Sequence, residues 1–389
     1  MRVLQLSKFY PPVMGGIESV AFELTEGLNR LGVETDVLCA NLTRATCQER
    51  SAMGYRVTRA GSLAKLLSTS LSPALVLHAK RQIDRYDLVH VQMPDPMAAL
   101  AIWAVRPRAK VVLHWQSDVV NQRRALKLYG PLQNWLLRRA DAIIATTPPY
   151  AESSPWLREF RAKIEVIPIG ISESVPPDTQ MKADALRERF NGKKIVFSLG
   201  RMIYYKGFDV LIDAAAALPE DCIVVVGGAG ELLARYRQEV AERGLSSRIC
   251  FEGRIEDADI AAYFAAADVF CLASTVRTEA FGVVLLEAMA MGKPLVTTNI
   301  AGSGVPWVNQ HGLTGFTVPV NDGKALAQSL RLVLEDPALA ERFGKAARAR
   351  FLDVFTAAAM VDRTAALYRR LMSGSSREAG RLERAAGLE

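Results

Sequence analysis

The chain has 389 residues, of which 50% are apolar and 23% are charged, so it is a folded globular protein that is too long for one ordinary domain. No apolar run approaches the ~20 residues that span a bilayer, and the apolar start of the chain is too short for a signal peptide. Five scattered cysteines without CxxC spacing argue against a disulfide framework and against a zinc site, and we expect a protein of a reducing cytoplasm.

The net charge of +7 comes entirely from the first half of the chain. Residues 1–170 hold 22 Lys/Arg and 14 Asp/Glu, whereas residues 171–389 hold 26 and 27. A basic face can bind nucleic acid, but no recognised nucleic-acid motif accompanies it, and we expect no nucleic-acid partner. An anionic membrane surface or an anionic acceptor would explain the excess at least as well.

Strand-like apolar runs alternate with helical stretches through the first half of the chain. This alternation predicts a parallel sheet with helices on both faces. Helices are expected between the strands, including residues 17–31 and 131–140. The predicted strands are 2–6, 34–40, 87–93, 110–115, 141–147 and 163–169.

A charged, proline-containing stretch then breaks the pattern, and we place a linker at residues 171–193. The sequence predicts an α/β protein of two doubly wound domains, residues 1–170 and 194–372, with a flexible tail at 373–389. We expect the ligand in a cleft between them, because ligands of α/β sheets bind at the carboxyl ends of the strands. The strands of the second domain are predicted at 194–200, 222–228, 248–253, 267–274 and 294–299.

Two cations follow the first strand of the second domain. Arg201 and Lys206 stand five positions apart around a turn punctuated by glycine. Fixed cations at the end of a strand suit a diphosphate. The alternative, ordinary solvated surface charges, stays open at this point.

The stretch "RTEAFGVVLLEAMAMGKPLV", residues 277–296, reads as a helix that is apolar on every side except at Glu287. A buried carboxylate needs a partner, which is either a neighbouring Arg or backbone donor, or a ligand. Glu279 precedes Glu287 by eight positions, at most about 12 Å along a helix, so the pair cannot act on one atom. The two carboxylates can hold two hydroxyl-bearing ends of one ligand, with the amides of residues 280–283 facing phosphate between them. That layout fits a nucleotide sugar.

With these motifs the chain resembles the retaining glycosyltransferases of family 4, which have the GT-B fold of two facing Rossmann-like domains. The resemblance covers residues 1 to about 372, and its most specific element is E-x7-E, from Glu279 to Glu287. It implies that Glu287 holds the ribose hydroxyls and that Glu279 holds hydroxyls of the transferred sugar. It implies that Arg201 and Lys206 bind the diphosphate and, with Glu279, take part in catalysis. The remaining donor-binding residues that it implies are Ala280, Phe281, Gly282 and Val283 at the phosphate and sugar, and Arg254 and Ile255 at the base.

The resemblance also assigns residues of the first domain. Gly15 and Gly16 match the family's glycine-rich loop, which approaches the donor phosphate or the acceptor. His114 matches a histidine that the family places at a strand end near the reacting sugar, and the alternative for it is a structural role. Glu18 and Asp118 are candidate acceptor contacts, although Glu18 also suits the positive end of a helix and Asp118 also suits a cap.

Two departures from the family pattern narrow the expected relatives. Glu279-Ala280-Phe281-Gly282 stands where E-G-F-G is common, and the later segment AGSGVPWVNQHG lacks a frequent glutamate. Both variants are similar to those of bacterial O-antigen and exopolysaccharide mannosyl- and rhamnosyltransferases. The resemblance therefore implies hexose transfer from a nucleotide-diphosphate sugar, with a GDP-sugar favoured over a UDP-sugar, to a lipid-linked saccharide acceptor. A UDP-sugar-dependent transferase with another acceptor, or an epimerase or phosphorylase of the same fold, is the alternative.

No cofactor and no metal are expected, because the cations can replace a metal at the diphosphate. We expect the protein in the cytoplasm, peripheral at the inner face of the membrane. Two basic, apolar segments, residues 62–81 and 121–139, are candidates for contact with an anionic membrane. The alternative is that both are ordinary amphipathic helices packed on their own sheet.

Overall fold

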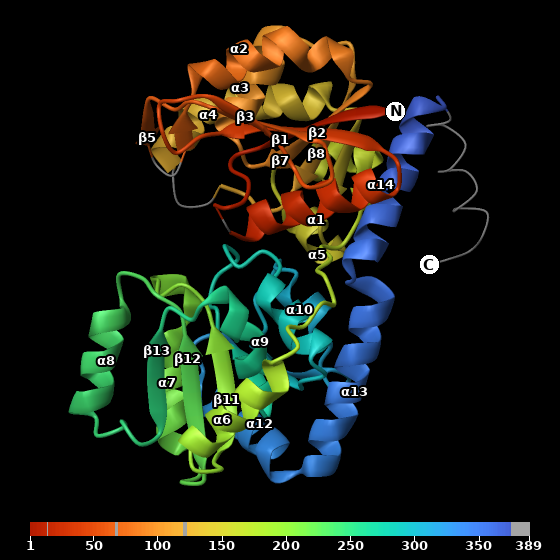
Figure 1. Cartoon of the computed structure of the whole chain (residues 1–389). Helices are drawn as coiled ribbons and strands as arrows, with labels where there is room; N and C mark the ends of the chain where they lie inside the picture. Colours follow the sequence, from red (N-terminus) through yellow and green to blue (C-terminus); the bar gives the residue numbers. More distant parts are fainter. Residues whose placement is uncertain (14, 67–68, 120–122, 375–389) are drawn as a thin grey trace. The chain divides into compact units, whose positions relative to one another are not determined.

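The computed structural model describes residues 1–13, 15–66, 69–119 and 123–374. They form two compact units, each built around its own sheet (Figure 1). Unit 1 comprises Met1–Gly170 together with the C-terminal segment from Ala357, and unit 2 comprises Ile171–Thr356. Among the described residues, no helix combines the length and the apolar character that crossing a membrane would require.

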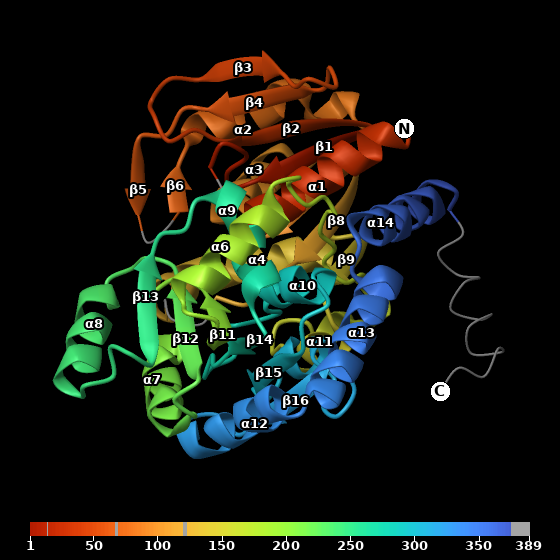
Figure 2. The same ribbon diagram turned by 60° about the horizontal axis from the view of Figure 1, so that its bottom comes forward.

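Unit 1 contains an eight-stranded sheet in the order β10-β9-β8-β7-β1-β2-β4-β3, in which only the exposed edge strand β3 runs antiparallel. A short antiparallel hairpin, β5–β6, stands apart from it (Figure 2). The strands are β1 Arg2–Ser7, β2 Glu34–Ala40, β3 Cys47–Arg50, β4 Arg56–Ala60, β5 Ala64–Leu66, β6 Thr69–Leu71, β7 Leu88–Met93, β8 Lys110–Trp115, β9 Ala142–Ala145 and β10 Ile164–Val166.

The strand order decides which face of this sheet each helix covers. Right-handed crossovers put α1 on one face and α2, α3 and α4 on the other, which would leave the α1 face bare beyond β1. The C-terminal helix α14 lies beside α1 (Figure 1) and covers that face, and its Tyr368 hydroxyl lies 2.5 Å from His90 Nδ1 on β7. The helices of unit 1 are α1 Gly16–Arg30, α2 Pro73–Gln82, α3 Pro96–Val105, α4 Arg123–Arg139, α5 Pro148–Ser153 and α14 Ala357–Met372, with 3-10 turns η1 Ile83–Arg85 and η2 Arg158–Lys163.

Unit 2 contains a six-stranded, wholly parallel sheet in the order β13-β12-β11-β14-β15-β16. Numbered within the unit, this is 3-2-1-4-5-6, the order of a dinucleotide-binding Rossmann sheet, whose direction of winding reverses between β11 and β14. The strands are β11 Lys194–Leu199, β12 Cys222–Gly227, β13 Ile249–Gly253, β14 Val269–Leu272, β15 Leu295–Thr298 and β16 Gly315–Val318.

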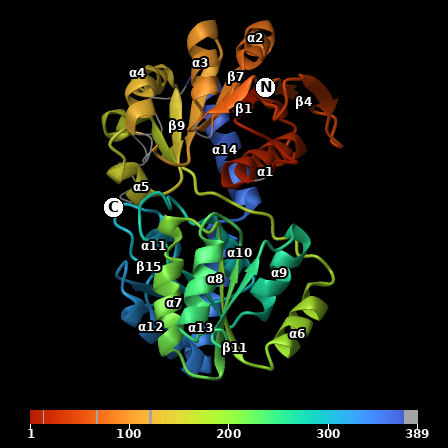
Figure 3. The same ribbon diagram turned by 90° about the vertical axis from the view of Figure 1, so that its left-hand side faces the viewer.

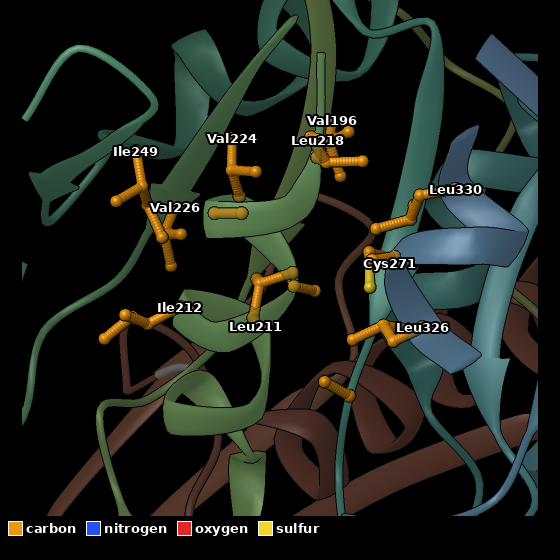
Figure 4. Close-up of a cluster of buried hydrophobic side chains, with 14 of the residues drawn as sticks. Val196, Leu211, Ile212, Leu218, Val224, Val226, Ile249, Cys271, Leu326 and Leu330 are labelled. Atoms are coloured by element: carbon orange, nitrogen blue, oxygen red, sulfur yellow. The ribbon is translucent and has the colours of Figure 1, made fainter. Parts of the chain in front are cut away.

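The core of unit 2 is an apolar layer between this sheet and helices α7, α8 and α12. Val196 and Val224 of the sheet pack with Leu211 of α7 and with Leu326 and Leu330 of α12 (Figure 4). Each fully buried side chain of this kind contributes about 1.5–3 kcal/mol, so the sheet is a stable platform for the loops at its edge. Helices α7 and α8 are seen in front of the sheet in Figure 3. The helices are α6 Thr179–Arg189, α7 Phe208–Ala217, α8 Leu233–Glu242, α9 Asp257–Ala266, α10 Val283–Ala290, α11 Val305–Val308, α12 Gly323–Glu335 and α13 Pro337–Val354, with a 3-10 turn η3 Tyr204–Lys206.

The structure divides the chain differently from the expected boundaries at two places. Residues 171–193, expected to be a linker, contain α6, which packs against α9 inside unit 2. The end of the expected second domain, from Ala357, belongs to unit 1 because α14 closes the open face of that sheet. Strands β3–β6 and β16 were not expected, since they are short and lack a long apolar run.

Candidate functional site

The candidate site of unit 2 lies at the carboxyl edge of its sheet, where the winding reverses. The loop after β11 carries Arg201 and Lys206, and the loop after β14 carries Glu279 and leads into α10. In open α/β sheets the crevice outside such a reversal is where ligands bind. The sequence placed these residues at strand ends, and the topology of the sheet brings the two loops together.

An ion pair joins the two loops. Lys206 Nζ lies 2.6 Å from Glu279 Oε2, and each side chain is only 12% exposed. The Ser274 hydroxyl donates to the same carboxylate oxygen over 2.9 Å. The pair fixes Glu279 at the switch point and leaves its second oxygen, Oε1, as an acceptor. Nothing in the sequence pattern singled out Ser274.

Arg201 is exposed and has no ion-pair or hydrogen-bond partner for its side chain in the part of the chain that the structure describes. Lys206 packs against Gly200, where an added Cβ would lie 3.2 Å from its Cε. The two predicted cations therefore differ: one is held by a carboxylate, and the other is open to solvent. A diphosphate could be bound by both from the same strand end.

The turn from Glu279 into α10 has a fixed backbone. Gly282, which precedes the helix, has φ of 78°, in the left-handed region that favours glycine. The turn is held by the segment that follows β15: Ser303 Oγ donates to the carbonyl of Glu279, and Gly304 N donates to the carbonyl of Ala280 over 2.7 Å. Ala280 and Phe281 are buried, so what this turn offers a ligand is the backbone amides at the start of α10.

Glu287 is the one charged residue of α10 and is half-buried. Burial raises the pKa of its carboxyl to about 7, and the negative charge of Asp257 adds to this effect. Within the described residues, no cation lies at ion-pairing distance and no side chain or backbone group donates a hydrogen bond to it. The described residues thus supply no arginine partner for Glu287, which leaves its carboxylate available to a ligand.

The glycines at the end of β12 and just after it allow close packing between loops. A side chain at Gly227 would overlap Ile255, and one at Gly228, whose φ is 127°, would overlap the carbonyl of Gly200. Ile255 is half-buried, whereas Arg254 is exposed and lies 4.0 Å from Glu256. These contacts bring the loops after β11, β12 and β13 to one place at the sheet edge.

In unit 1, His114 lies near the end of β8, the strand that the sequence predicts at residues 110–115. It is the fifth residue of β8 and is fully buried, with its ring 5.4 Å from that of His90 on β7. Neither ring nitrogen has a partner among the described residues, and burial lowers the pKa of the imidazole to about 4. This burial agrees with the structural alternative for His114, and its expected role near a reacting sugar stays a prediction.

Asp118 has the structural role that the sequence left open. Its Oδ1 accepts from Trp115 Nε1 and from Ser154 Oγ, each over 2.8 Å, and its backbone N–H donates to the Tyr150 hydroxyl over 2.6 Å. Asp118 is also buried. These bonds order the turn after β8, whereas a direct acceptor contact of Asp118 stays a prediction.

Glu18 and the two glycines lie at the start of α1, after β1. A side chain at Gly15 would lie 2.5 Å from Glu18 Oε2, while Gly16 has open space around it. Burial raises the pKa of Glu18, and the nearby cations Lys8 and Lys65 oppose that shift. Glu18 is thus a half-buried carboxyl with two lysines nearby, at the carboxyl edge of the sheet.

Sequence reasoning missed Asp95, which follows β7 at the same edge. Asp95 caps α3, since its Oδ1 accepts from the amides of Met97 and Ala98, and it is buried. Its Oδ2 has no partner among the described residues, and burial raises its pKa. The signal was present as Asp before Pro at the start of a helical stretch.

Comparison with known proteins shows which protein family the chain belongs to. Residues 14–175 match the family model described as Glycosyltransferase Family 4, and residues 182–350 match that of Glycosyl transferases group 1. The O-antigen chain mannosyltransferase C of Escherichia coli is 35% identical over 97% of this chain and 100% of its own length. The chain belongs to these glycosyltransferases. The family expected from E-x7-E is confirmed.

A second relative of this glycosyltransferase is the D-rhamnosyltransferase WbpZ of Pseudomonas aeruginosa, 34% identical over 92% of this chain and 93% of its own. Among solved structures, sucrose-phosphate synthase of Thermosynechococcus elongatus aligns with a TM-score of 0.78 at 24% identity, over 96% of this chain and 99% of its own. Anabaena HepE in complex with UDP-glucose aligns with a TM-score of 0.74 at 20% identity, over 95% and 99%. Likenesses at this identity show the fold, and the expected GT-B fold is confirmed.

Proposed function

We propose that this glycosyltransferase moves a hexose, of the mannose or rhamnose type, with retention from a nucleotide-diphosphate sugar to a lipid-linked saccharide acceptor in the synthesis of bacterial surface polysaccharide. The names of the two relatives at 34–35% identity support the sugar and the pathway class. The observation that carries the proposal is Glu287, a half-buried carboxylate without a partner among the described residues, on the helix that follows Glu279 of the Lys206–Glu279 pair.

In this proposal each part of the donor has a partner at the edge of unit 2. Glu287 accepts hydrogen bonds from the ribose hydroxyls, and the exposed Arg201 and the amides at the start of α10 bind the diphosphate. Lys206 turns one of its three donors toward the diphosphate while it keeps Glu279 in place. Glu279 Oε1 accepts from hydroxyls of the transferred sugar, and Arg254 and Ile255 contact the base.

The chemical step transfers the anomeric carbon from the diphosphate oxygen to an acceptor hydroxyl on the same face of the sugar. Negative charge grows on the departing nucleoside diphosphate, where Arg201, Lys206 and the helix amides stabilise it. The acceptor proton goes to the leaving phosphate oxygen, so no protein nucleophile and no metal is required. Gly15 and Gly16 of unit 1 allow close approach of backbone to donor phosphate or acceptor.

Turnover with purified protein tests the donor. We expect GDP-mannose or a GDP-rhamnose to release GDP only when a lipid-linked saccharide is present, with an α-linked product from an α-linked donor by NMR. An inverted product would contradict retention. Turnover with UDP-glucose but not with a GDP-sugar would favour a UDP-sugar-dependent transferase. The structure of the neighbour HepE in complex with UDP-glucose is the reason to test this alternative. Nucleotide release without an acceptor would favour an epimerase.

The proposed location is the cytoplasmic face of an anionic membrane, reached through the basic unit 1. Of the two candidate segments, 121–139 includes Arg123, Arg124 and Lys127, whose side chains lie outside those the structure describes. Each engaged basic residue contributes about 1 kcal/mol near an anionic leaflet. Co-sedimentation with anionic vesicles should fall with added salt and with charge reversal at these three positions. No binding at low salt, with full activity on a soluble acceptor, would contradict this location.

A further inference from the structure

An apolar groove of about 600 Å³ opens on unit 1 between the β5–β6 hairpin and helices α2 and α3. Figure 2 shows the hairpin apart from the main sheet. Helix α2 begins at Pro73 and helix α3 begins at Pro96. Both starts lie at the edge of the sheet where the parallel strands have their carboxyl ends. The groove therefore starts at the same sheet edge as Glu18. Its apolar lining includes Leu63, Leu71, Val76, Leu77, Met97 and Leu100.

The groove is not a gap in the core, because its leucines face solvent. Leu63 is 61% exposed and Leu77 is 47% exposed. Trp103, one turn after Leu100 on α3, is 45% exposed as well. A contiguous apolar surface of this kind marks a binding site rather than ordinary surface composition, and an exposed tryptophan suits a boundary between water and hydrocarbon.

Positive charge lies in the groove lining and on the hairpin beside it. Lys80 lines it from α2. Lys65, on the hairpin that forms one wall, has its Nζ 5.8 Å from the ring centroid of Phe9, and Lys8 Nζ lies 5.8 Å from the same ring. Both lysines are close enough to Glu18 to act on its charge. The hairpin therefore connects the positively charged region of Lys8 and Lys65 at the sheet edge with the apolar groove.

We propose that this groove binds the hydrocarbon chain of the lipid-linked acceptor, with its phosphates at Lys8 and Lys65 and its saccharide at Glu18. The inference rests on the proposed function and specifies where its acceptor lies. The pairing of an apolar lining with cations at the rim is complementary to one anionic lipid. The volume is that of a site for a single small ligand, which favours one chain over the surface of a bilayer.

Farnesyl diphosphate is the probe, with inorganic diphosphate as its headgroup control, measured by calorimetry on the full chain. Saturating GDP or UDP, whichever the protein binds, keeps both probes out of the diphosphate site of unit 2. Farnesyl diphosphate should bind at least tenfold more tightly than inorganic diphosphate. Leu63→Glu and Leu77→Glu should remove that difference, whereas Leu332→Glu, at a 49% exposed position of unit 2, should keep it. Lys65→Gln should weaken both probes.

Unchanged farnesyl diphosphate binding in both groove variants, with unchanged melting temperatures, would overturn the inference. So would groove variants that lose binding to anionic vesicles while they keep farnesyl diphosphate, since the groove would then contact a bilayer. The proposed function fails separately, through absence of sugar transfer, because probe binding requires no turnover. Loss of activity on a long-chain acceptor, with activity on a short-chain analogue retained in Leu77→Glu, would support the inference further.

Discussion

The sheet of unit 1 buries polar side chains within its strands, whereas the sheet of unit 2 keeps its charged site residues in the loops beyond them. Among the described residues, six strand residues of unit 1 carry a buried polar atom without a partner: Gln5, Ser7, Thr58, His90, Gln92 and His114. The strands of unit 2 are described in full, and none of their buried side-chain polar atoms lacks a partner. On one face these strands pack into the apolar layer of Figure 4.

This difference matters because an unpaired buried polar group costs about 1–3 kcal/mol unless water or a rearrangement satisfies it. Unit 2 avoids that cost inside its sheet and has its unpartnered buried charge at Glu287, in a helix beyond the strands. Unit 1 carries polar groups in its interior; Gln5 and His90, for example, face α1 and α14. We therefore expect substitutions in unit 2 to act on catalysis and substitutions in the unit 1 strands to act on stability.

The largest expected effect is on catalysis in unit 2. Replacing Arg201 or Lys206 by Ala should lower kcat by roughly 10²–10³, because each removes one stabiliser of the departing diphosphate. Binding of a nucleoside monophosphate should weaken much less than that of the diphosphate, as isothermal titration would show. Lys345→Ala, an exposed lysine of the same unit, is the matched control. Equal losses for mono- and diphosphate would mean that these cations act elsewhere.

The next effect is on acid stability and belongs to unit 1. Since the folded-state pKa of His114 is about 4 and an unfolded histidine titrates near 6.5, the unfolded state takes up the proton first as pH falls. The stability associated with neutral His114 is therefore present above pH 6.5 and is lost between pH 6.5 and 4, by about 3 kcal/mol.

His114→Gln removes this titration, so its unfolding free energy should fall less than that of the wild type over the same interval, as urea titrations at several pH values would reveal. His311→Gln, at an exposed histidine of unit 2, should keep the wild-type pH dependence. Parallel curves for wild type and His114→Gln would show that His114 does not titrate in this window.

The smallest expected effect is a gain in stability when Glu287 is replaced, together with a loss of donor binding. The pKa of Glu287 is raised to about 7, so its carboxylate destabilises the ligand-free fold above that pH, and this effect disappears below the unfolded value of ~4.3. Glu287→Gln should raise the free energy of unfolding at pH 8 by about 1 kcal/mol. This value is smaller than the pKa shift alone would give, because solvent screens a partly exposed group. The variant should also lose donor binding.

Thermal shift at pH 8 and pH 4, with and without donor, measures both consequences of Glu287→Gln. Glu335→Gln, on the exposed face of α12, is the control. A lower melting temperature at pH 8 with donor binding retained would place Glu287 in the structural core and not at the ribose.

The sequence alone determined the local features of this protein. Apolar runs and their spacing located the strands that form the centre of both sheets, and the charged residues just beyond them located the switch-point loops of unit 2. Glu287 could be identified because a single carboxylate in an apolar helix is visible in the sequence itself.

Only the tertiary structure decided which distant residues meet. Lys206 and Glu279 pair across 73 positions, and His90 and Tyr368 across 278. The apolar face of α14 would suit either sheet as far as its pattern shows; it joins unit 1 because the right-handed crossovers there leave one face uncovered. His114 likewise reads as a residue near a strand end, and the structure adds that it is fully buried beside His90 of β7. Periodicity reports which side of an element is apolar, whereas the partner of that side is set by topology.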